Sequence, residues 1–323
     1  MDSVDRRLPN LMQTEFPLTT EPYAALGRRL GIDANEVIRR IAQLKEKGII
    51  RLIGPVLDSR SLGYRTTLVA MRVAETQLKK AERVIAGHPG VSHGYEREHH
   101  FNVWFTLAVP PLIDIETELE QLIRSTGAEA AFSLLAIKVF KIGVYFDMDE
   151  IGQNASVAHQ SSVLAKQVEL SRTDRLIINE LQQDLLLIPI PFNAMAERVS
   201  VGIEEFLATC RSLQQRGVIR RFSASINHHH AGFTANAMSC WVAPSGTVDI
   251  AGRELASLKE VSHCYERKTN PLWRYNLFAL IHCRSREVCR EIAEKVSHET
   301  GLADYVLLYS TKEFKKTRVK YLV

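Results

Sequence analysis

The strongest constraint on the fold of this chain is a heptapeptide that occurs twice. The segment Val91-Ser-His-Gly-Tyr-Glu-Arg97 returns as Val261-Ser-His-Cys-Tyr-Glu-Arg267, with six of seven residues identical. The match belongs to a longer duplication, because a single offset of 169 residues aligns the segment from Pro22 to Val73 with the segment that begins at Pro191. The chain is therefore predicted to consist of two diverged copies of one module.

Each copy is predicted to begin with a helix-turn-helix. In the first copy, the segment 22–30 starts with a proline at a favourable first helical position, and Asp33 can cap a second helix that runs to Gly48. A short strand over 49–53 follows, so the outline is that of a winged helix-turn-helix. The second copy repeats this pattern over 191–199, 203–215 and 218–222.

Each copy is then predicted to continue in the order β-α-β-β-α-β, which is typical of ferredoxin-like domains. The segments are 64–73, 77–86, 91–98, 101–109, 112–125 and 131–146 in the first copy, and 234–242, 248–257, 261–268, 273–283, 285–299 and 305–314 in the second. The fold class is thus predicted to be α+β, a tandem duplication of a winged helix-turn-helix plus a ferredoxin-like domain. The predicted units are helix-turn-helix domains at 1–55 and 171–223, ferredoxin-like domains at 56–147 and 224–323, and a linker at 148–170.

Composition narrows the class of protein. The 323 residues suffice for two ordinary domains, and a content of 46% hydrophobic and 24% charged residues is that of a soluble globular protein. No apolar run approaches the roughly 20 residues needed to span a bilayer, and the N-terminus resembles no secretory signal. The five cysteines lie in the second half without a C-x-x-C pair, which favours reduced thiols in a cytoplasm. The formal charge of +4 permits an anionic ligand or nucleic acid without requiring either.

The repeated heptapeptide predicts a ligand pocket. Side chains alternate between the faces of a strand, so His93, Tyr95 and Arg97 should share one face, with Ser92 and Glu96 on the other. The second copy should present its histidine, tyrosine and arginine in the same way. The alternative is an ordinary half-solvated strand, but that interpretation does not explain why three polar side chains recur together.

Two further stretches indicate a family. A helix-turn-helix followed by a β-α-β-β-α-β domain resembles the Lrp/AsnC family of transcription factors, which use the second domain to dimerise and to sense amino acids. The segments 88–107, 261–267 and 273–278 resemble the sirohaem decarboxylases, a branch of that superfamily. The first half is similar to the D-type subunit and the second half to the L-type subunit, here fused in one polypeptide.

The resemblance implies an enzyme, a non-oxidative carboxy-lyase. Sirohaem would lose carbon dioxide from the acetate side chains of rings C and D, giving 12,18-didecarboxysirohaem for the biosynthesis of haem d1 in denitrifiers or for the alternative haem pathway. Family likeness also implies that no separate cofactor or oxidant is required, since the iron-containing tetrapyrrole is itself the substrate.

The residues of the motif suit that chemistry. Sirohaem carries eight carboxylates, and the guanidinium groups of Arg97 and Arg267 suit bidentate carboxylate binding. The new methyl group needs a proton, for which His93 and His263 are the candidate donors. Arg65 is a weaker candidate for carboxylate binding. Further candidates for substrate contacts are Tyr95, His99, His100, Asn102, Tyr265, Trp273, Arg274, Tyr275 and Asn276, with the two asparagines suited to binding either backbone or a ligand carboxylate.

The two halves differ just after the motif. The second half carries a connection four residues longer between the motif arginine and its asparagine, which predicts two non-equivalent pockets, one of them catalytic. The run His228-His229-His230 is interpreted as a solvated turn, with His230 the best candidate for a site, and no protein metal site is expected. Axial ligation of the sirohaem iron by a histidine or tyrosine remains open at this stage.

A different class of function must be weighed. The alternative is an Lrp/AsnC-type DNA-binding regulator that senses a tetrapyrrole or another small anion. The first recognition helix carries Arg39, Arg40, Lys45 and Lys47, which permits DNA binding. The second begins with Glu204 and Glu205, which disfavours it. We therefore expect both helix-turn-helix units to be scaffold without DNA binding. The expected partners are sirohaem and a second copy in a homodimer, with a need for additional homologous subunits left open.

Overall fold

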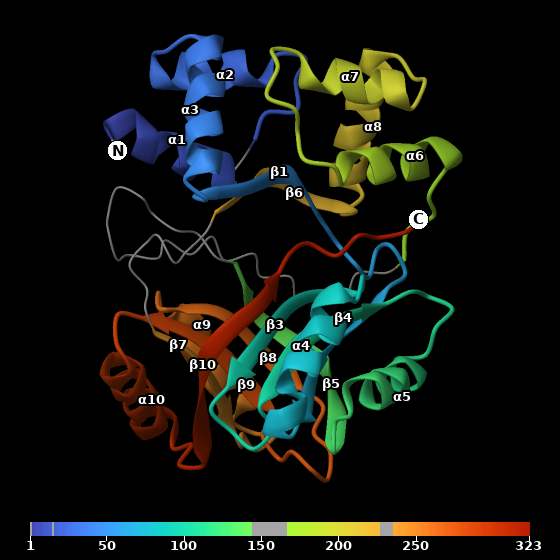
Figure 1. The fold of residues 1–323 in the computed structure, drawn as a ribbon. Coiled ribbons are helices and arrows are strands. Elements are labelled where there is room, and N and C mark those ends of the chain that lie inside the picture. The colour runs from blue at the N-terminus through green and yellow to red at the C-terminus, as the bar shows by residue number, and fades with distance from the viewer. Residues whose placement is uncertain (1, 15, 144–166, 227–234) are drawn as a thin grey trace.

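The computed structural model describes residues 2–14, 16–143, 167–226 and 235–323. They form two layers, a helical layer and a β-barrel beneath it, and each layer is built from both copies of the module (Figure 1). Most of the predicted linker, and His230, lie outside the described residues. No helix in the described part of the chain has the length and apolar character needed to cross a bilayer.

The helical layer contains two three-helix units. They consist of α1 (Ser3–Thr14), α2 (Pro22–Leu30) and α3 (Ala34–Glu46) from the first copy and α6 (Arg172–Leu181), α7 (Pro191–Arg198) and α8 (Ile203–Gln215) from the second. The two predicted helices of each unit are confirmed, and the Asp33 side chain caps α3 by accepting a bond from the backbone N–H of Glu36 at 2.9 Å. The helices α1 and α6 were not predicted. Both are amphipathic, and they bury residues such as Leu8 and Ile177 in the core of this layer.

The two units are joined by a two-stranded ribbon. Strand β1 (Ile50–Leu57) pairs antiparallel with β6 (Ile219–Ile226), so that the wings of the two copies form one sheet. The predicted domain boundaries after residues 55 and 223 are wrong, because each falls inside one of these strands. Pairing between the copies extends both strands beyond what their local sequence indicates.

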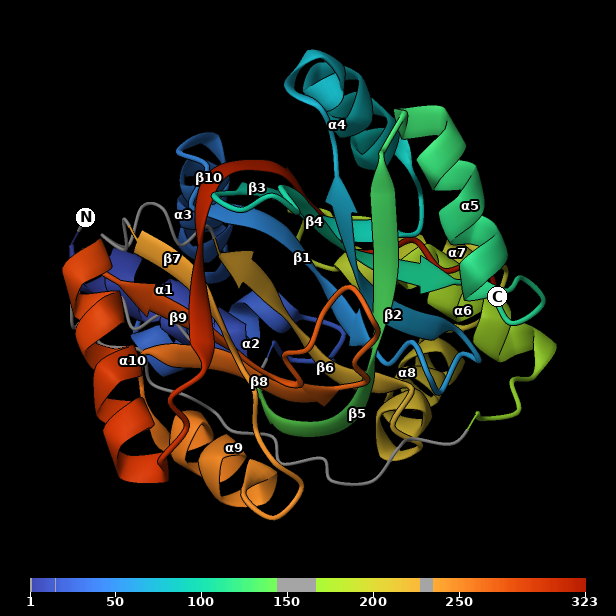
Figure 2. The same cartoon turned by 90° about the horizontal axis from the view of Figure 1, so that it is seen from below.

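The lower layer is a closed eight-stranded antiparallel barrel. Its strand order is β10-β3-β4-β2-β5-β8-β9-β7, and Figure 2 shows it from below with the helices outside the ring of strands. The first copy contributes the strands β2 (Arg65–Arg72), β3 (Val91–Arg97), β4 (Val103–Val109) and β5 (Ala130–Ile142), and the second copy contributes β7 (Ala235–Trp241), β8 (Val261–Arg267), β9 (Leu277–Cys283) and β10 (Tyr305–Lys316). The helices outside the barrel are α4 (Leu78–Gly87), α5 (Ile115–Thr126), α9 (Val248–Ser257) and α10 (Arg286–Thr300). A short 3-10 helix, η1 (Glu75–Gln77), precedes α4. Within each copy the predicted β-α-β-β-α-β order is confirmed.

The last strand of each copy closes the barrel. Strand β5 pairs with β2 of its own copy and with β8 of the other, and β10 pairs in the same way with β7 and β3. Close packing fixes these crossings, since a Cβ added at Gly94 would collide with the ring of Phe314 on β10. In the second copy, helix α9 packs against β5, and a Cβ at Gly252 of this helix would lie 2.5 Å from the ring of Phe140 on β5. A side chain at either glycine would therefore push the closing strand outward.

Candidate active site

The barrel encloses a cavity of about 360 Å³ that both copies of the module line. This volume lies in the range of small-molecule sites. The polar and charged residues of its wall are Asp58, Ser59, Arg60, Thr66, Thr67, Ser92, His93, Tyr95, Arg97, Thr106, Arg220, His263, Tyr265 and Arg267. Both heptapeptides face the same cavity, so the prediction of two separate pockets is wrong. The reason is the closing of the two sheets into one barrel, which brings the equivalent faces together.

The geometry of β3 and β8 explains which side chains reach the cavity. His93, Tyr95 and Arg97 all line it, which confirms the predicted shared face. Ser92 was predicted on the opposite face, and this was wrong. The register of β3 against β4 shifts by one residue between Val91 and His93, and this irregularity brings Ser92 to the cavity wall as well. The same shift occurs in β8 before His263.

Burial and nearby cations favour the neutral form of both motif histidines. The Nδ1 atom of His93 is 2.9 Å from the hydroxyl of Ser92, and that of His263 is 2.9 Å from the hydroxyl of Ser262. Burial, followed by the nearby ammonium of Lys316, lowers the pKa of His93 to about 3 and that of His263 to about 4. Each ring is half-buried and contributes to the cavity wall, so Nε2 is the nitrogen left for a ligand.

The two motif arginines reach across the boundary between the copies. Arg97 donates from Nη1 to the backbone carbonyl of Leu308 at 2.8 Å, and Arg267 donates in the same way to Leu134 at 2.9 Å. Each guanidinium also stacks on the tyrosine of its own motif, at 5.1 Å in the first copy and 4.7 Å in the second. Burial lowers the pKa of both groups to about 10, so both remain charged at neutral pH. Each arginine therefore links the two copies through its hydrogen bond and also places a positive charge in the cavity wall.

Two further arginines of the wall, Arg60 and Arg220, were missed by the sequence analysis. Arg220 donates from Nε to the buried carboxylate of Asp58 at 2.7 Å, which joins the first copy to the second. Asp58 also accepts a bond from the backbone N–H of Arg60 at 2.9 Å. The duplication offered a signal, because Arg220 aligns with Arg51. The described wall residues include four arginines and only one carboxylate, that of Asp58. This excess of positive charge suits an anionic ligand.

The closing strands make the two sides of the cavity chemically different. On the side of the first motif, β10 places Glu313 opposite the tyrosine and Lys316 opposite the histidine. On the side of the second motif, β5 places Val139 and Ile142 at the equivalent positions. Lys316 lies 3.7 Å from the Glu313 carboxylate. The two motifs therefore have different neighbours on the closing strands, polar residues beside the first and apolar residues beside the second.

The two asparagines that follow the motifs bind backbone. Asn102 accepts a bond from the N–H of Val73 at 3.0 Å and donates to its carbonyl at 2.9 Å. Asn276 makes the equivalent pair of bonds with Ala243, both at 2.8 Å. Of the two roles predicted for these residues, the structure supports binding of backbone over binding of a ligand carboxylate.

The remaining predicted contact residues lie away from the cavity wall. Trp273 is 3% exposed and packs in an aromatic cluster, 5.0 Å from the ring of Trp104 and 5.4 Å from that of His99. Trp104 is itself buried in this cluster and also contributes to the cavity wall. The tight turn that pairs Asn270 with Trp273 turns this segment into the cluster. His100, Tyr275, Arg274 and Arg65 also lie outside the wall, with Arg274 paired to Asp304 and Arg65 to Asp114.

The described residues contain no group of three or more His, Cys, Asp or Glu side chains arranged to hold a metal ion. Five cysteines are free and buried.

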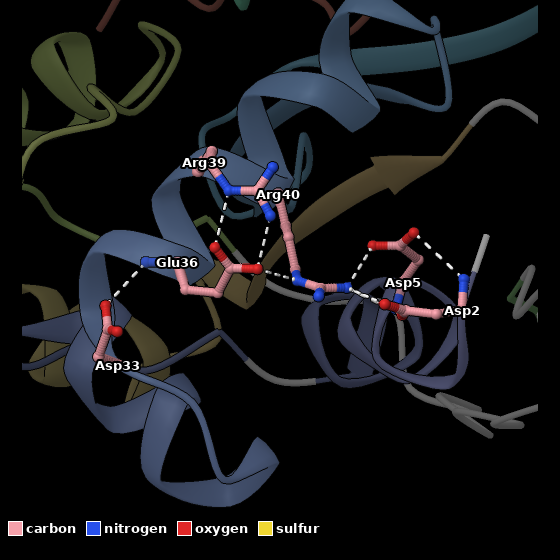
Figure 3. A network of polar contacts seen from close by, with 6 residues as sticks. All are labelled: Asp2, Asp5, Asp33, Glu36, Arg39 and Arg40. Atoms are coloured by element: carbon pink, nitrogen blue, oxygen red, sulfur yellow. Dashed lines mark hydrogen bonds and ion pairs between the residues drawn. The ribbon is translucent and has the colours of Figure 1, made fainter.

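The basic residues of the first recognition helix are held in an ion-pair network. Arg40 contacts Asp2 at 2.7 Å and Asp5 at 2.8 Å, both on or next to α1, and Glu36 at 2.7 Å (Figure 3). Arg39 binds the same Glu36 carboxylate at 2.6 Å. Two of the basic side chains that this helix would offer to phosphate, Arg39 and Arg40, are thus already paired with carboxylates.

Comparison with known proteins identifies the family to which both modules of the chain belong. A model of the "AsnC-like ligand binding domain" matches residues 61–141 and 230–315, and a model of the "Siroheme decarboxylase NirDL-like HTH domain" matches residues 5–51 and 174–220. The chain is 39% identical over 319 residues to the siroheme decarboxylase of Hydrogenobacter thermophilus, covering 98% of this chain and 94% of that protein. The chain belongs to the sirohaem decarboxylase family.

Other members of the sirohaem decarboxylase family support the fused arrangement. A solved structure described as siroheme decarboxylase NirDL in co-complex with an iron-uroporphyrin III analogue superposes with a TM-score of 0.77, at 34% identity, covering 99% of this chain and 95% of that one. The siroheme decarboxylase alpha subunit of Desulfovibrio desulfuricans is 42% identical over 149 residues, covering 46% of this chain and 86% of that protein. One copy of the module thus corresponds to one separate subunit of such a relative.

Proposed function

We propose that this chain decarboxylates sirohaem at the acetates of rings C and D, giving 12,18-didecarboxysirohaem, and that the shared barrel cavity is the active site. The observation that carries the proposal is the convergence of both His-x-Tyr-x-Arg faces on one cavity rich in cations. The proposal extends to the role of the product as a precursor of haem d1 or of haem by the alternative pathway.

Binding is assigned to the arginines of the wall. Sirohaem brings up to eight carboxylates, and Arg60, Arg97, Arg220 and Arg267 offer guanidinium groups that pair with them. The same residues place positive charge around the macrocycle before the ligand arrives, so little reorganisation is needed on binding. The apolar residues of the wall, among them Phe105, suit the face of the tetrapyrrole.

The chemistry asks the protein for orientation and a proton. In each step the bond between the acetate methylene and its carboxylate breaks, carbon dioxide leaves, and the electron pair is delocalised into the macrocycle until the methylene carbon takes up one proton to become a methyl group. No oxidant or reductant enters this balance, and we propose that no cofactor is required. The protein's own contribution is the placement of a proton donor near each reacting carbon.

The histidines become competent donors when the substrate binds. Without a bound anion, burial and neighbouring cations hold the pKa of His93 and His263 well below the ordinary histidine value. A bound polyanion offsets the field of Lys316 and of the arginines, which is the smaller of the two causes of the lowered pKa, and so raises the pKa of both imidazoles. Protonation is thereby coupled to occupancy, and each imidazolium has its Nε2 side toward the cavity.

The rest of the molecule is proposed to be scaffold. Pairing of Arg39 and Arg40 with carboxylates supports helix-turn-helix units that do not bind DNA. The buried free thiols suit a cytoplasmic enzyme. The proposed assembly is a homodimer of the fused chain.

The deciding experiment is anaerobic incubation of the purified protein with sirohaem, followed by mass spectrometry of the pigment. Loss of two carbon dioxides is expected from the wild type, and His93→Ala and His263→Ala should retain pigment binding while losing activity unequally. Tight pigment binding with an unchanged mass would refute the proposal. Gel-shift binding to its own promoter at physiological salt would then favour the regulator.

A further inference from the structure

A buried histidine outside the cavity wall is connected to the motif histidine of the second copy through a serine hydroxyl. His282 lies on β9, is 4% exposed, and places Nε2 2.9 Å from the hydroxyl of Ser262. The same hydroxyl is 2.9 Å from Nδ1 of His263. The three side chains form a continuous chain from the core of the second copy to the cavity.

The chemistry of this chain sets the direction of its hydrogens. A serine hydroxyl has one hydrogen to donate, and an imidazole in its neutral form has one N–H and one acceptor nitrogen. The contact from Ser262 to the carbonyl of Leu280 is long, at 3.4 Å, so the two imidazoles are its main partners. When His282 donates to Ser262, the serine donates to Nδ1 of His263, and the hydrogen of His263 must sit on Nε2. An imidazolium at His263 donates from Nδ1 to Ser262, and Ser262 can then donate to Nε2 of His282 only in the tautomer of His282 that carries its hydrogen on Nδ1.

The first copy lacks this arrangement. Its strands pair in the same register, with Val91 opposite Leu107 where the second copy has Val261 opposite Ile281. The residue after Leu107 is Ala108, so a methyl group stands where the second copy has the imidazole of His282. The first copy therefore keeps only the bond between its serine and histidine.

We infer that His282 is a positioning residue that donates to Ser262 and, through it, holds neutral His263 with Nε2–H toward the cavity. The inference rests on the proposed decarboxylation of sirohaem and predicts that the two decarboxylations depend differently on His282. Because the chain supports only one of the two donors, its loss impairs one of the two decarboxylations and leaves the other intact. The expected product of a broken chain is a tetrapyrrole that has lost a single carbon dioxide.

The test compares His282→Leu, His282→Gln and Ser262→Ala with the wild type in anaerobic single-turnover reactions. Sirohaem affinity, read by visible absorption, should stay at the wild-type value in all three proteins, because His282 and Ser262 sit behind the imidazole. His282→Leu and Ser262→Ala should slow one carbon dioxide loss by about tenfold or more, so that the monodecarboxylated pigment accumulates. His282→Gln, whose amide can still donate to and accept from the serine, should restore most of the rate. The matched control is His298→Leu at an exposed position of α10.

Two further measurements, the rate of a double variant and the tautomer of His263, distinguish this role from general damage to the fold. His282→Leu with Ser262→Ala should be no slower than either single variant, since both break one chain. Nitrogen-15 NMR of labelled histidines should show His263 as one tautomer with the hydrogen on Nε2 in the wild type and as a mixture in His282→Leu. Equal slowing of both losses, additive effects, failure of glutamine to rescue, or an unchanged tautomer would each overturn the inference. A wild type that binds sirohaem without losing carbon dioxide would refute the proposed function instead, and the tautomer measurement would still test the chain.

Discussion

Acidification should destabilise this protein through its two motif histidines. In the folded chain the pKa of His93 is lowered to about 3 and that of His263 to about 4, because burial and the ammonium of Lys316 disfavour the imidazolium. An unfolded histidine has a pKa of about 6.5. The unfolded state therefore binds more protons than the folded state over the window between these values, and stability falls as pH falls through it.

The magnitude follows from the width of that window. At pH 5 an unfolded imidazole is about 1.5 units below its pKa and gains about 2 kcal/mol from protonation, while the folded group gains almost nothing. Each histidine should thus remove about 2 kcal/mol of stability between pH 7.5 and pH 5.0, and the pair about 4 kcal/mol. Replacement by glutamine removes the titrating group and with it this loss.

The assay is urea unfolding at both pH values, followed by tryptophan fluorescence. Trp104, Trp241 and Trp273 are all buried in the barrel, so their emission reports the unfolding of the layer that holds the site. His93→Gln and His263→Gln should each lose about 2 kcal/mol less than the wild type on acidification. The control His298→Gln changes an exposed position and should unfold as the wild type does. Equal losses in the wild type and both cavity variants would refute the reasoning.

Three further predictions concern packing, backbone support and ligand binding. Gly94→Ala should cost about 1–3 kcal/mol of stability in thermal unfolding, because the added methyl group collides with Phe314. The control Gly246→Ala should cost far less, because its methyl group would meet no atom within 4 Å. Asn102→Ala should lower stability by about 1–3 kcal/mol by leaving two backbone groups unpaired, yet a pigment titration should give the wild-type affinity. Arg97→Lys keeps the charge but loses the planar fork, so the same titration should show roughly tenfold weaker sirohaem binding; unchanged affinity would contradict the assigned role.

The sequence by itself determined the modules and much of their content. A single register held from Pro22 to Val73 revealed the duplication together with the repeated heptapeptide, and the spacing of apolar residues, caps and glycines placed helices such as α3 and α8 close to their observed bounds. Alternation along a strand predicted that His93, Tyr95 and Arg97 share a face. These features depend on neighbours within a few residues, which local backbone geometry relates directly.

Only the tertiary structure decided that the two faces share one cavity. The contact from Arg97 to Leu308 joins residues 211 positions apart, and no local pattern encodes such a pairing. The same pairing placed Glu313 and Lys316 beside one motif and Val139 beside the other. The bulge that moves Ser92 depends on the partner strand, which likewise lies outside the reach of sequence periodicity.

The chemical asymmetry of the site has the same origin. Arg60, Arg220 and His282 carry no motif in the sequence, and each acquires its place only when strands and loops from distant segments pack together. A chain fixes which side chains it carries and how they alternate, but barrel closure fixes which of them meet. The cavity, its positive charge and the unequal support of its two histidines are therefore properties of strand pairing between the copies.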